Sequence, residues 1–359
     1  MSVLKELDWV VLLAILFLAL LSLAALYPFS VLNNVNYFWR QLIFYLIAFG
    51  VVIGLSFLNV SFLKKQRGLI LILYGIGLAL LILVLIFSEN IRGAASWITF
   101  VPGKAGFEPA ELMRILVIFI LARYFTVKRL DIHKFSSIIL SALYAGIPAV
   151  FILLQPDLGA AIVFFLLWFG IVIMAGIRWQ HLFLIVLVIV VGTGLLWNFG
   201  LKPYQKVRVI SFLNPASDPL GANYSRNQSI IAIGAGGLWG RGFGNNVHSL
   251  DGFLPEAHND FMFATLTESL GLSGVAIIFA LYGTIIYRLL TFEGKHNFDR
   301  LYASSLGLLI FIEAAINIAI ALGLLPVTGL TLPFLSYGGS SIISLCIGLG
   351  IYQALYVKS

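Results

Sequence analysis

A short polar stretch, EAHND from Glu256 to Asp260, stands directly before a long apolar run. Charged groups at the edge of a membrane span are costly to keep, which points to a function. A carboxylate partly withdrawn from water is a better base, so Asp260 is a candidate general base, with Glu256 and His258 as candidate binding groups. Two alternatives stand beside this one. The stretch could ligate a metal, although no HExxH-like spacing is present, or Asn259 or Asp260 could cap the next helix.

A second polar group opens another apolar run. Pro109 suits the first turn of a helix, and Glu111 and Arg114 are three residues apart and therefore share a helix face. One alternative is that the pair does no more than neutralise two buried charges. The other is that Arg114 also faces an anionic ligand.

Three further carboxylates leave their roles open. Asp157, in the tight turn QPD, could cap the following helix or line a cavity. Glu268 and Glu313 lie deep within apolar runs, where ionisable groups are functional suspects. Each could equally be held in a buried structural pair, with Arg114 or with a backbone group, or the two could belong to a transport path.

The segment from 200 to 260 combines basic and glycine-rich pieces. Lys206 and Arg208 alternate with apolar residues over 202–215, a pattern typical of an amphipathic stretch at a membrane surface with its basic side toward phosphates. A plain solvated face would look the same. The glycine-rich piece 233–246 lacks the GK[ST] of a phosphate loop, so a hinge or re-entrant turn is favoured over a nucleotide cradle.

The elements that carry these residues are membrane helices. The chain is 61% hydrophobic and only 10% charged, its mean hydropathy is +1.04, and about 20 apolar residues are needed to cross a bilayer. The predicted fold is an all-α polytopic membrane protein, a single domain over 1–359. The ten predicted spans are 9–27, 38–57, 69–87, 110–125, 137–154, 158–175, 182–199, 261–287, 303–323 and 338–357.

Basic residues in the short loops set the orientation. They concentrate in alternate connections, which puts both termini in the cytoplasm and the large 200–260 loop, between helices seven and eight, outside. The net charge of +7 therefore reflects topology and not nucleic-acid binding. The first apolar run is too long for a cleavable signal peptide. The lone Cys346 allows no intrachain disulfide.

Five motifs together resemble the SEDS family (shape, elongation, division and sporulation). They occur in family order between about 90 and 345, and are FEPAELMR, QPDLGAA, YQKVRVISFLNPASDPLGANYSRNQSIIAIGAGGLWGRGFG, FLPEAHNDFMFATLTE and GLTLPFLSYGGSS. The forms FLNPASDPLG and FLPEAHNDF look more like the elongation branch than the division branch.

The resemblance implies a peptidoglycan glycosyltransferase in the bacterial cell (inner) membrane that polymerises lipid II onto polyprenyl-linked nascent glycan, beside a class B penicillin-binding protein. Asp260 matches the essential aspartate of the family. Glu111, Arg114 and Asp157 match polar residues of its outer cavity. Trp97 matches the family's tryptophan at the lipid-phosphate site, although Ser96 stands where the family has arginine.

The same family pattern has a lysine where this chain has Arg114, and Gln-Pro-Ser-Glu where it has Glu108-Pro109-Ala110-Glu111. The positive charge at this position is kept, but as the planar guanidinium of arginine and not the compact ammonium of lysine.

In the implied reaction Asp260 accepts a proton from the attacking hydroxyl. Positive charge from Arg114, Lys206 and Arg208, or from a divalent cation such as Mg²⁺ or Mn²⁺, stabilises the departing pyrophosphate. The alternatives are a lipid II flippase and a scaffold that only recruits the transpeptidase.

Overall fold

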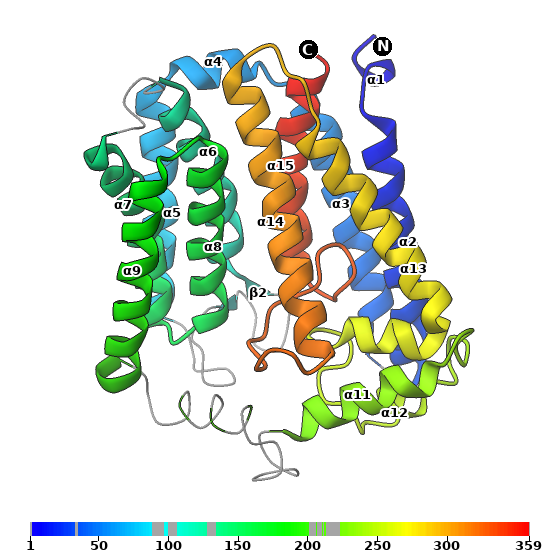
Figure 1. The fold of residues 1–359 in the computed structure, drawn as a ribbon. Helices are drawn as coiled ribbons and strands as arrows, with labels where there is room; N and C mark the ends of the chain where they lie inside the picture. Colours follow the sequence, from blue (N-terminus) through cyan, green and yellow to red (C-terminus); the bar gives the residue numbers. More distant parts are fainter. Residues whose placement is uncertain are drawn as a thin grey trace.

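The computed structural model describes residues 2–32, 35–87, 97–99, 106–127, 134–200, 206, 210, 212 and 223–358. Helices make up most of this part of the chain (Figure 1), as predicted. They are α1 (Ser2–Lys5), α2 (Trp9–Leu32), α3 (Tyr37–Ser56), α4 (Val60–Lys65), α5 (Arg67–Phe87), α6 (Pro109–Val127), α7 (Phe135–Leu154), α8 (Leu158–Met174), α9 (Trp179–Leu195) with the π-helical turn η2 (Leu196–Gly200), α11 (Tyr224–Gly236), α12 (Val247–Leu250), α13 (Met262–Leu290), α14 (Asn297–Ala321) and α15 (Gly339–Tyr356). Two-residue strands β1 (Ile98–Thr99) and β2 (Gly106–Phe107) pair antiparallel.

Each predicted span coincides with a helix, and within the described residues seven helices are long and apolar enough to cross a membrane. These are α2, α3, α5, α7, α13, α14 and α15. Helices α8 and α9 have 17 residues each, fewer than the 20 or so that a bilayer requires. Helix α6 is interrupted by charges, including Glu111 and Arg114. The chain is a polytopic membrane protein, and the count of ten spans stays a prediction.

Helix α14 lies at the centre of the bundle (Figure 1) and packs against α6, α8, α13 and α15. In its most apolar stretch 67% of the residues are buried, against 28% for the peripheral α5. A lipid-facing helix can be apolar all round, whereas a central helix can carry polar side chains only where protein partners satisfy them. Glu313 and Asn317 are such buried polar residues on α14.

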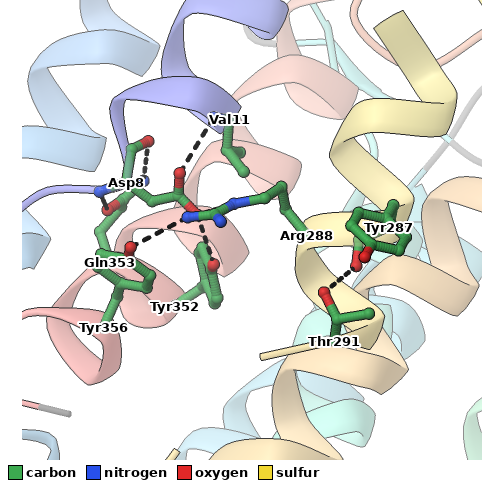
Figure 2. A network of polar contacts seen from close by, with 8 residues as sticks. All are labelled: Asp8, Val11, Tyr287, Arg288, Thr291, Tyr352, Gln353 and Tyr356. Atoms are coloured by element: carbon green, nitrogen blue, oxygen red, sulfur yellow. Dashed lines mark hydrogen bonds and ion pairs between the residues drawn. The ribbon is translucent and has the colours of Figure 1, made fainter. Parts of the chain in front are cut away.

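Both termini lie at one end of the bundle (Figure 1), where a polar network joins them. The buried Asp8 accepts hydrogen bonds from Arg288 Nε at 3.1 Å and Tyr352 OH at 2.8 Å (Figure 2). Gln353 pairs with the backbone of Asp8 through both its amide atoms, at 2.9 and 3.2 Å. The segment before α2, the end of α13 and the end of α15 are thereby held together.

At the opposite end α13 is broken at Gly271, whose φ of 68° and ψ of −164° are not helical. The glycine-rich turn after α11 fills the break: the amide N–H of Leu272 donates to the carbonyl of Gly237 at 2.9 Å, and that of Gly242 donates to the carbonyl of Ser269 at 2.8 Å. A Cβ on Gly240 would lie 2.1 Å from the Ser269 carbonyl oxygen. Glycine is needed at this position because the two backbones are in direct contact. The glycine-rich segment is therefore a turn packed against α13.

Replacing Asp8 by Asn should lower the unfolding free energy of the detergent-solubilised protein by about 1–3 kcal/mol, because charge-assisted hydrogen bonds to a buried carboxylate are lost. Thermal unfolding monitored by circular dichroism measures the change. The matched control is Glu6→Gln, since Glu6 is exposed two residues away. Equal midpoints for the two variants would contradict a stabilising role of the network.

Candidate active site

Asp260 is the second-last residue before α13 and is partly buried. The N-cap residue of the helix is Phe261, whose side chain makes no capping hydrogen bond. The alternative that places Asn259 or Asp260 at the N-cap position is therefore wrong. The Asp260 carbonyl accepts a hydrogen bond from Asn317 Nδ2 of α14 at 2.9 Å, and the same amide donates to the Leu330 carbonyl at 2.6 Å. Asn317 thus joins the aspartate backbone to the loop between α14 and α15.

The rest of the EAHND stretch is tied down by backbone contacts. The Asn259 carbonyl accepts from Ser336 Oγ at 2.6 Å, and the His258 carbonyl accepts from the Tyr337 amide at 2.9 Å. Glu256, whose φ is +55°, accepts from Asn259 Nδ2 at 2.9 Å. Glu256 therefore shapes its own turn.

His258 sits in an aromatic cluster. Its ring centroid lies 4.6 Å from that of Tyr37 and 6.0 Å from those of Phe29 and Tyr337. These rings come from α2, the start of α3 and the α14–α15 loop. The contacts support a role for His258 in positioning Asp260, and a direct contact with substrate stays a prediction.

The α14–α15 loop (322–338) that carries these partners is itself held by α2 and α3. Ser22 Oγ donates to the Leu335 carbonyl at 2.7 Å, and Tyr45 OH donates to the Phe334 carbonyl at 2.7 Å. Gln41 Nε2 donates to the Ser336 carbonyl at 3.1 Å. Buried hydroxyl and amide groups thus satisfy an irregular backbone, which is tolerated at membrane depth only with such partners.

Arg114 is 2% exposed and binds two carboxylates on different helices. Its Nη1 lies 2.8 Å from Glu111 Oε2 on α6 and 2.7 Å from Glu313 Oε1 on α14. The predicted pair is confirmed, and Glu313 extends it. Arg114 Nε and Nη2 have no hydrogen-bond partner among the described residues. These two N–H groups leave Arg114 able to bind an anion in addition to neutralising its neighbours.

Asp157 and Glu108 stand at the edge of this cluster. Asp157 Oδ1 accepts from the Ala160 amide at 2.9 Å, so it does cap α8. Burial raises the pKa of the Asp157 carboxyl, against the opposing effects of the Ala160 hydrogen bond and the Arg114 charge. Burial also raises the pKa of Glu108 well above its ordinary value, and the nearby Glu111 and Asp157 carboxylates raise it further. Glu108 therefore keeps its proton to a higher pH than a free glutamate does.

The two polar groups are linked through α14. Glu313, which binds Arg114, and Asn317, which binds the Asp260 backbone, are four residues apart on one face of the helix, or about 6 Å along its axis. A second link runs through the α14–α15 loop. Gly159 of α8 abuts Thr328, and a Cβ on the next residue, Gly329, would lie 3.9 Å from Asp260 Oδ2. Helix α14 and the α14–α15 loop therefore both connect the segment of Asp260 to the surroundings of Arg114.

Comparison with known proteins identifies the chain. The family model of FtsW, RodA and SpoVE, described as cell cycle protein, matches residues 5–359. The chain belongs to this family. It is the SEDS family that the motifs resemble.

Named relatives of this SEDS protein come from both branches. It is 39% identical to a probable peptidoglycan glycosyltransferase FtsW of Hydrogenovibrio crunogenus over 81% of this chain and 74% of the relative. It is 36% identical to the peptidoglycan glycosyltransferase MrdB of Escherichia coli over 79% of this chain and 76% of the relative. With such relatives across most of its length, this SEDS protein is an enzyme of the glycosyltransferase class.

Solved structures of the same family share its fold. A chain from a peptidoglycan synthase complex, described as coordinating polymerization and crosslinking, superposes with a TM-score of 0.81 at 31% identity, over 98% of this chain and 97% of that one. RodA of Thermus thermophilus superposes with a TM-score of 0.71 at 28% identity, over 98% and 96%.

The remaining predicted binding residues are Trp97, Lys206 and Arg208. Trp97 is partly buried and directly precedes β1. Ile98 pairs with Phe107, so one more step in the same register places Trp97 opposite Glu108. Lys206 is partly buried, and no contact joins it to the cluster within the described residues. Arg208 lies outside the described residues. Direct substrate contacts of all three stay predictions.

For Glu313, the alternative of a buried structural pair with Arg114 is confirmed. Nothing in the sequence indicated that Asn317 holds the Asp260 backbone, because such a partner depends on which helix packs opposite. Glu268 proves to be structural. Its Oε1 accepts from the His248 amide at 3.0 Å, and its Oε2 accepts from the amide and the hydroxyl of Ser249 at 3.1 and 2.7 Å. Both carboxylates that the transport alternative relied on are thus engaged in local pairs.

Metal ligation was the other alternative. Over the described part of the chain, no group of three or more His, Cys, Asp or Glu side chains is arranged to hold a metal ion.

The shared Arg114 allows a double-mutant test. Arg114→Gln alone leaves two buried carboxylates without their cation and should cost about 3–5 kcal/mol of unfolding free energy. Adding Glu313→Gln should recover part of this, with a coupling of about 0.5–3 kcal/mol. Unfolding of all variants in detergent measures the cycle.

Glu268→Gln in the same Arg114→Gln background is the matched control, because Glu268 is buried but pairs elsewhere. Its effect should add to that of Arg114→Gln. Additive effects for Glu313 as well would contradict the proposed sharing of the guanidinium.

Proposed function

We propose that this enzyme polymerises lipid II into glycan strands, with Asp260 as general base and Arg114 contacting the pyrophosphate of the donor. The observation that carries the proposal is the single face of α14, on which Glu313 holds Arg114 and Asn317 holds the backbone of Asp260. Glu313 and Asn317 are one helical turn apart, so neighbouring turns of one helix hold the cation and the backbone of the base, an alignment that a displacement with a leaving pyrophosphate requires. The family membership and the glycosyltransferase relatives support the substrate class.

The reaction is one displacement. The growing glycan is the donor, its anomeric carbon bonded to polyprenyl pyrophosphate, and the acceptor is a sugar hydroxyl of incoming lipid II. As the hydroxyl oxygen bonds to the anomeric carbon, its proton passes to Asp260 and the bond to pyrophosphate breaks. A single attack from the face opposite the leaving group inverts that carbon. A positioned base typically contributes about 10²–10⁴-fold to the rate.

Negative charge builds up on the departing pyrophosphate, so a donor that points at it stabilises the transition state more than the ground state. Arg114 Nε and Nη2, which lack partners among the described residues, would supply two such N–H groups. Glu111 and Glu313 hold the guanidinium in place. Further positive charge is assigned to Lys206 and Arg208, and the remaining substrate contacts to Trp97, Asp157, Glu256 and His258.

The topology that fits this chemistry has ten spans, both termini in the cytoplasm and the active site on the outer side of the bacterial cell (inner) membrane. In support, both termini lie at the end of the bundle opposite α11 and α12, the helices that precede Asp260 in the chain (Figure 1). A single membrane domain over 1–359 with an outer loop over 200–260 is part of the same proposal. The polyprenyl tails of donor and acceptor require a site that opens sideways to lipid.

Replacing Asp260 by Asn should reduce polymerisation of labelled lipid II by about 10²-fold or more, because the amide cannot take the proton. The assay uses the purified protein in complex with a class B penicillin-binding protein that has no glycosyltransferase activity of its own. Asp251→Asn is the matched control, since Asp251 is an exposed carboxylate in the same loop.

Glycan strands from a folded Asp260→Asn variant at the rate of the Asp251→Asn variant would remove Asp260 from the chemistry. If wild-type protein also made no strands, the flippase would become the better hypothesis.

We assign the enzyme to cell elongation, with a class B penicillin-binding protein as its partner. The motif forms FLNPASDPLG and FLPEAHNDF favour this branch, and a similar solved chain belongs to a peptidoglycan synthase complex. Depletion of the enzyme from rod-shaped cells should then make them round while division continues. Microscopy of cell shape measures this change. Filaments with unchanged width would assign the enzyme to division instead.

A further inference from the structure

A cavity of about 220 Å³ opens beside the first turn of α11, apart from the Arg114 cluster. Phe212, Asn223, Ser225 and Arg226 line one side, and 325–327 of the α14–α15 loop line the other. A water molecule takes about 30 Å³ in the liquid, so a phosphate or carboxylate group fits with room for its attachment. The polar lining comes from a charged, an amide and a hydroxyl side chain.

Arg226 is the unusual member of this lining. Its Nε and Nη1 are buried and have no hydrogen-bond partner among the described residues. Its guanidinium lies over the ring of Phe212, with Cζ 5.2 Å from the ring centroid. A buried donor without a partner costs free energy, and more so when it is charged. The planar fork of a guanidinium matches the two oxygens of a carboxylate or phosphate.

The chain holds this side chain in place. Ser229, three residues further along α11, donates its hydroxyl to the Ala321 carbonyl at 2.7 Å and so fixes α11 against the end of α14. Gly323 then turns the chain with a φ of +72°, and a Cβ there would lie 2.7 Å from Arg226 Nε. Arg226 is therefore confined between two elements and does not simply extend into solvent.

Arg226 and Arg114 also differ in whether a carboxylate among the described residues pairs with them. Arg114 binds two carboxylates, whereas no ion pair involving Arg226 occurs within the described residues. A net positive charge in a cavity selects an anion. Arg114 and Arg226 are thus electrostatically different.

The cavity lies close to the proposed reaction centre. Its wall residue Val327 is two residues before Gly329, where a Cβ would lie 3.9 Å from Asp260 Oδ2. Two residues span at most about 7 Å. One substrate molecule can therefore reach both Asp260 and Arg226.

We propose that Arg226 and this cavity form an anion subsite that holds a phosphate or carboxylate group of the lipid-linked substrate while its sugar lies at Asp260. The proposal rests on the proposed function for the identity of that substrate. Two parts of lipid II carry the required chemistry: the pyrophosphate and the carboxylates of the peptide stem.

The test is binding of fluorescent short-chain lipid II to protein that carries Asp260→Asn, so that no turnover interferes. Arg226→Gln should weaken binding by about tenfold or more, as expected for loss of a charge-assisted pair. Arg226→Lys, which keeps the charge and loses the fork, should fall between. Arg241→Gln is the matched control, because Arg241 is exposed on the neighbouring turn, and it should leave affinity unchanged.

A second probe, lipid II with amidated stem carboxylates, separates the two anion sources. If wild-type affinity for this probe falls about tenfold and Arg226→Gln adds nothing, the subsite holds a carboxylate. If Arg226→Gln weakens both probes equally, it holds the pyrophosphate. Unchanged affinity of Arg226→Gln and Arg226→Lys for both probes would overturn the subsite.

The outcome is independent of the polymerase assay. Polymerisation by wild-type protein together with unchanged binding by Arg226→Gln would retain the enzyme and remove the subsite. Weakened binding by Arg226→Gln in a protein that makes no strands would retain an anion subsite and remove the polymerase. Thermal unfolding midpoints of the variants show whether each one is folded, and Arg226→Lys serves if Arg226→Gln is not.

Discussion

A guanidinium buried among membrane helices must be balanced before those helices can pack, and Arg114 meets this requirement with carboxylates from two helices. Glu111 is a neighbour on its own helix α6, while Glu313 comes from α14 at the centre of the bundle. Because neither charge is tolerable alone in that environment, the pair sets how α6 lies against α14. The position of the remaining N–H groups of Arg114 follows from this packing.

The same helix carries the constraint to the opposite side of the site. Asn317, one turn beyond Glu313, holds both the Asp260 backbone and the α14–α15 loop, and that loop is held in turn by hydroxyl and amide groups of α2 and α3. An irregular loop with so many backbone partners is rigid. Preorganised groups lose little entropy when substrate binds, which suits a reaction in which two large lipid-linked molecules must be aligned.

The broken helix α13 gives a further reason why the end of the bundle that carries Asp260 differs from the rest. Its break at Gly271 leaves backbone groups that the turn after α11 pairs with, and Glu268 binds the segment around Ser249 just before the EAHND loop. Glu268 thus helps to hold together the segment that precedes the EAHND loop. At the other end of the bundle, the hydrogen bond between Arg288 and Asp8 holds the helix ends together.

Much of this was determined by the sequence alone. Apolar runs of membrane length predicted each long helix, since lipid leaves the backbone few other choices, and spacing of three residues predicted the contact of Glu111 with Arg114. Local chemistry likewise predicted that Asp157 could cap α8. These features depend on neighbours in the chain.

Only the tertiary structure decided which distant residues meet. Glu313 and Arg114 are 199 residues apart in sequence, and nothing in either segment specifies the partner, because many helix arrangements bury a charge equally well. The partners of Asp260, the exclusion of a helix-cap role for it, and the cavity at Arg226 likewise arise where α11, α13, α14 and their loops come together. Local spacing cannot report such contacts, since they are set by how whole helices pack.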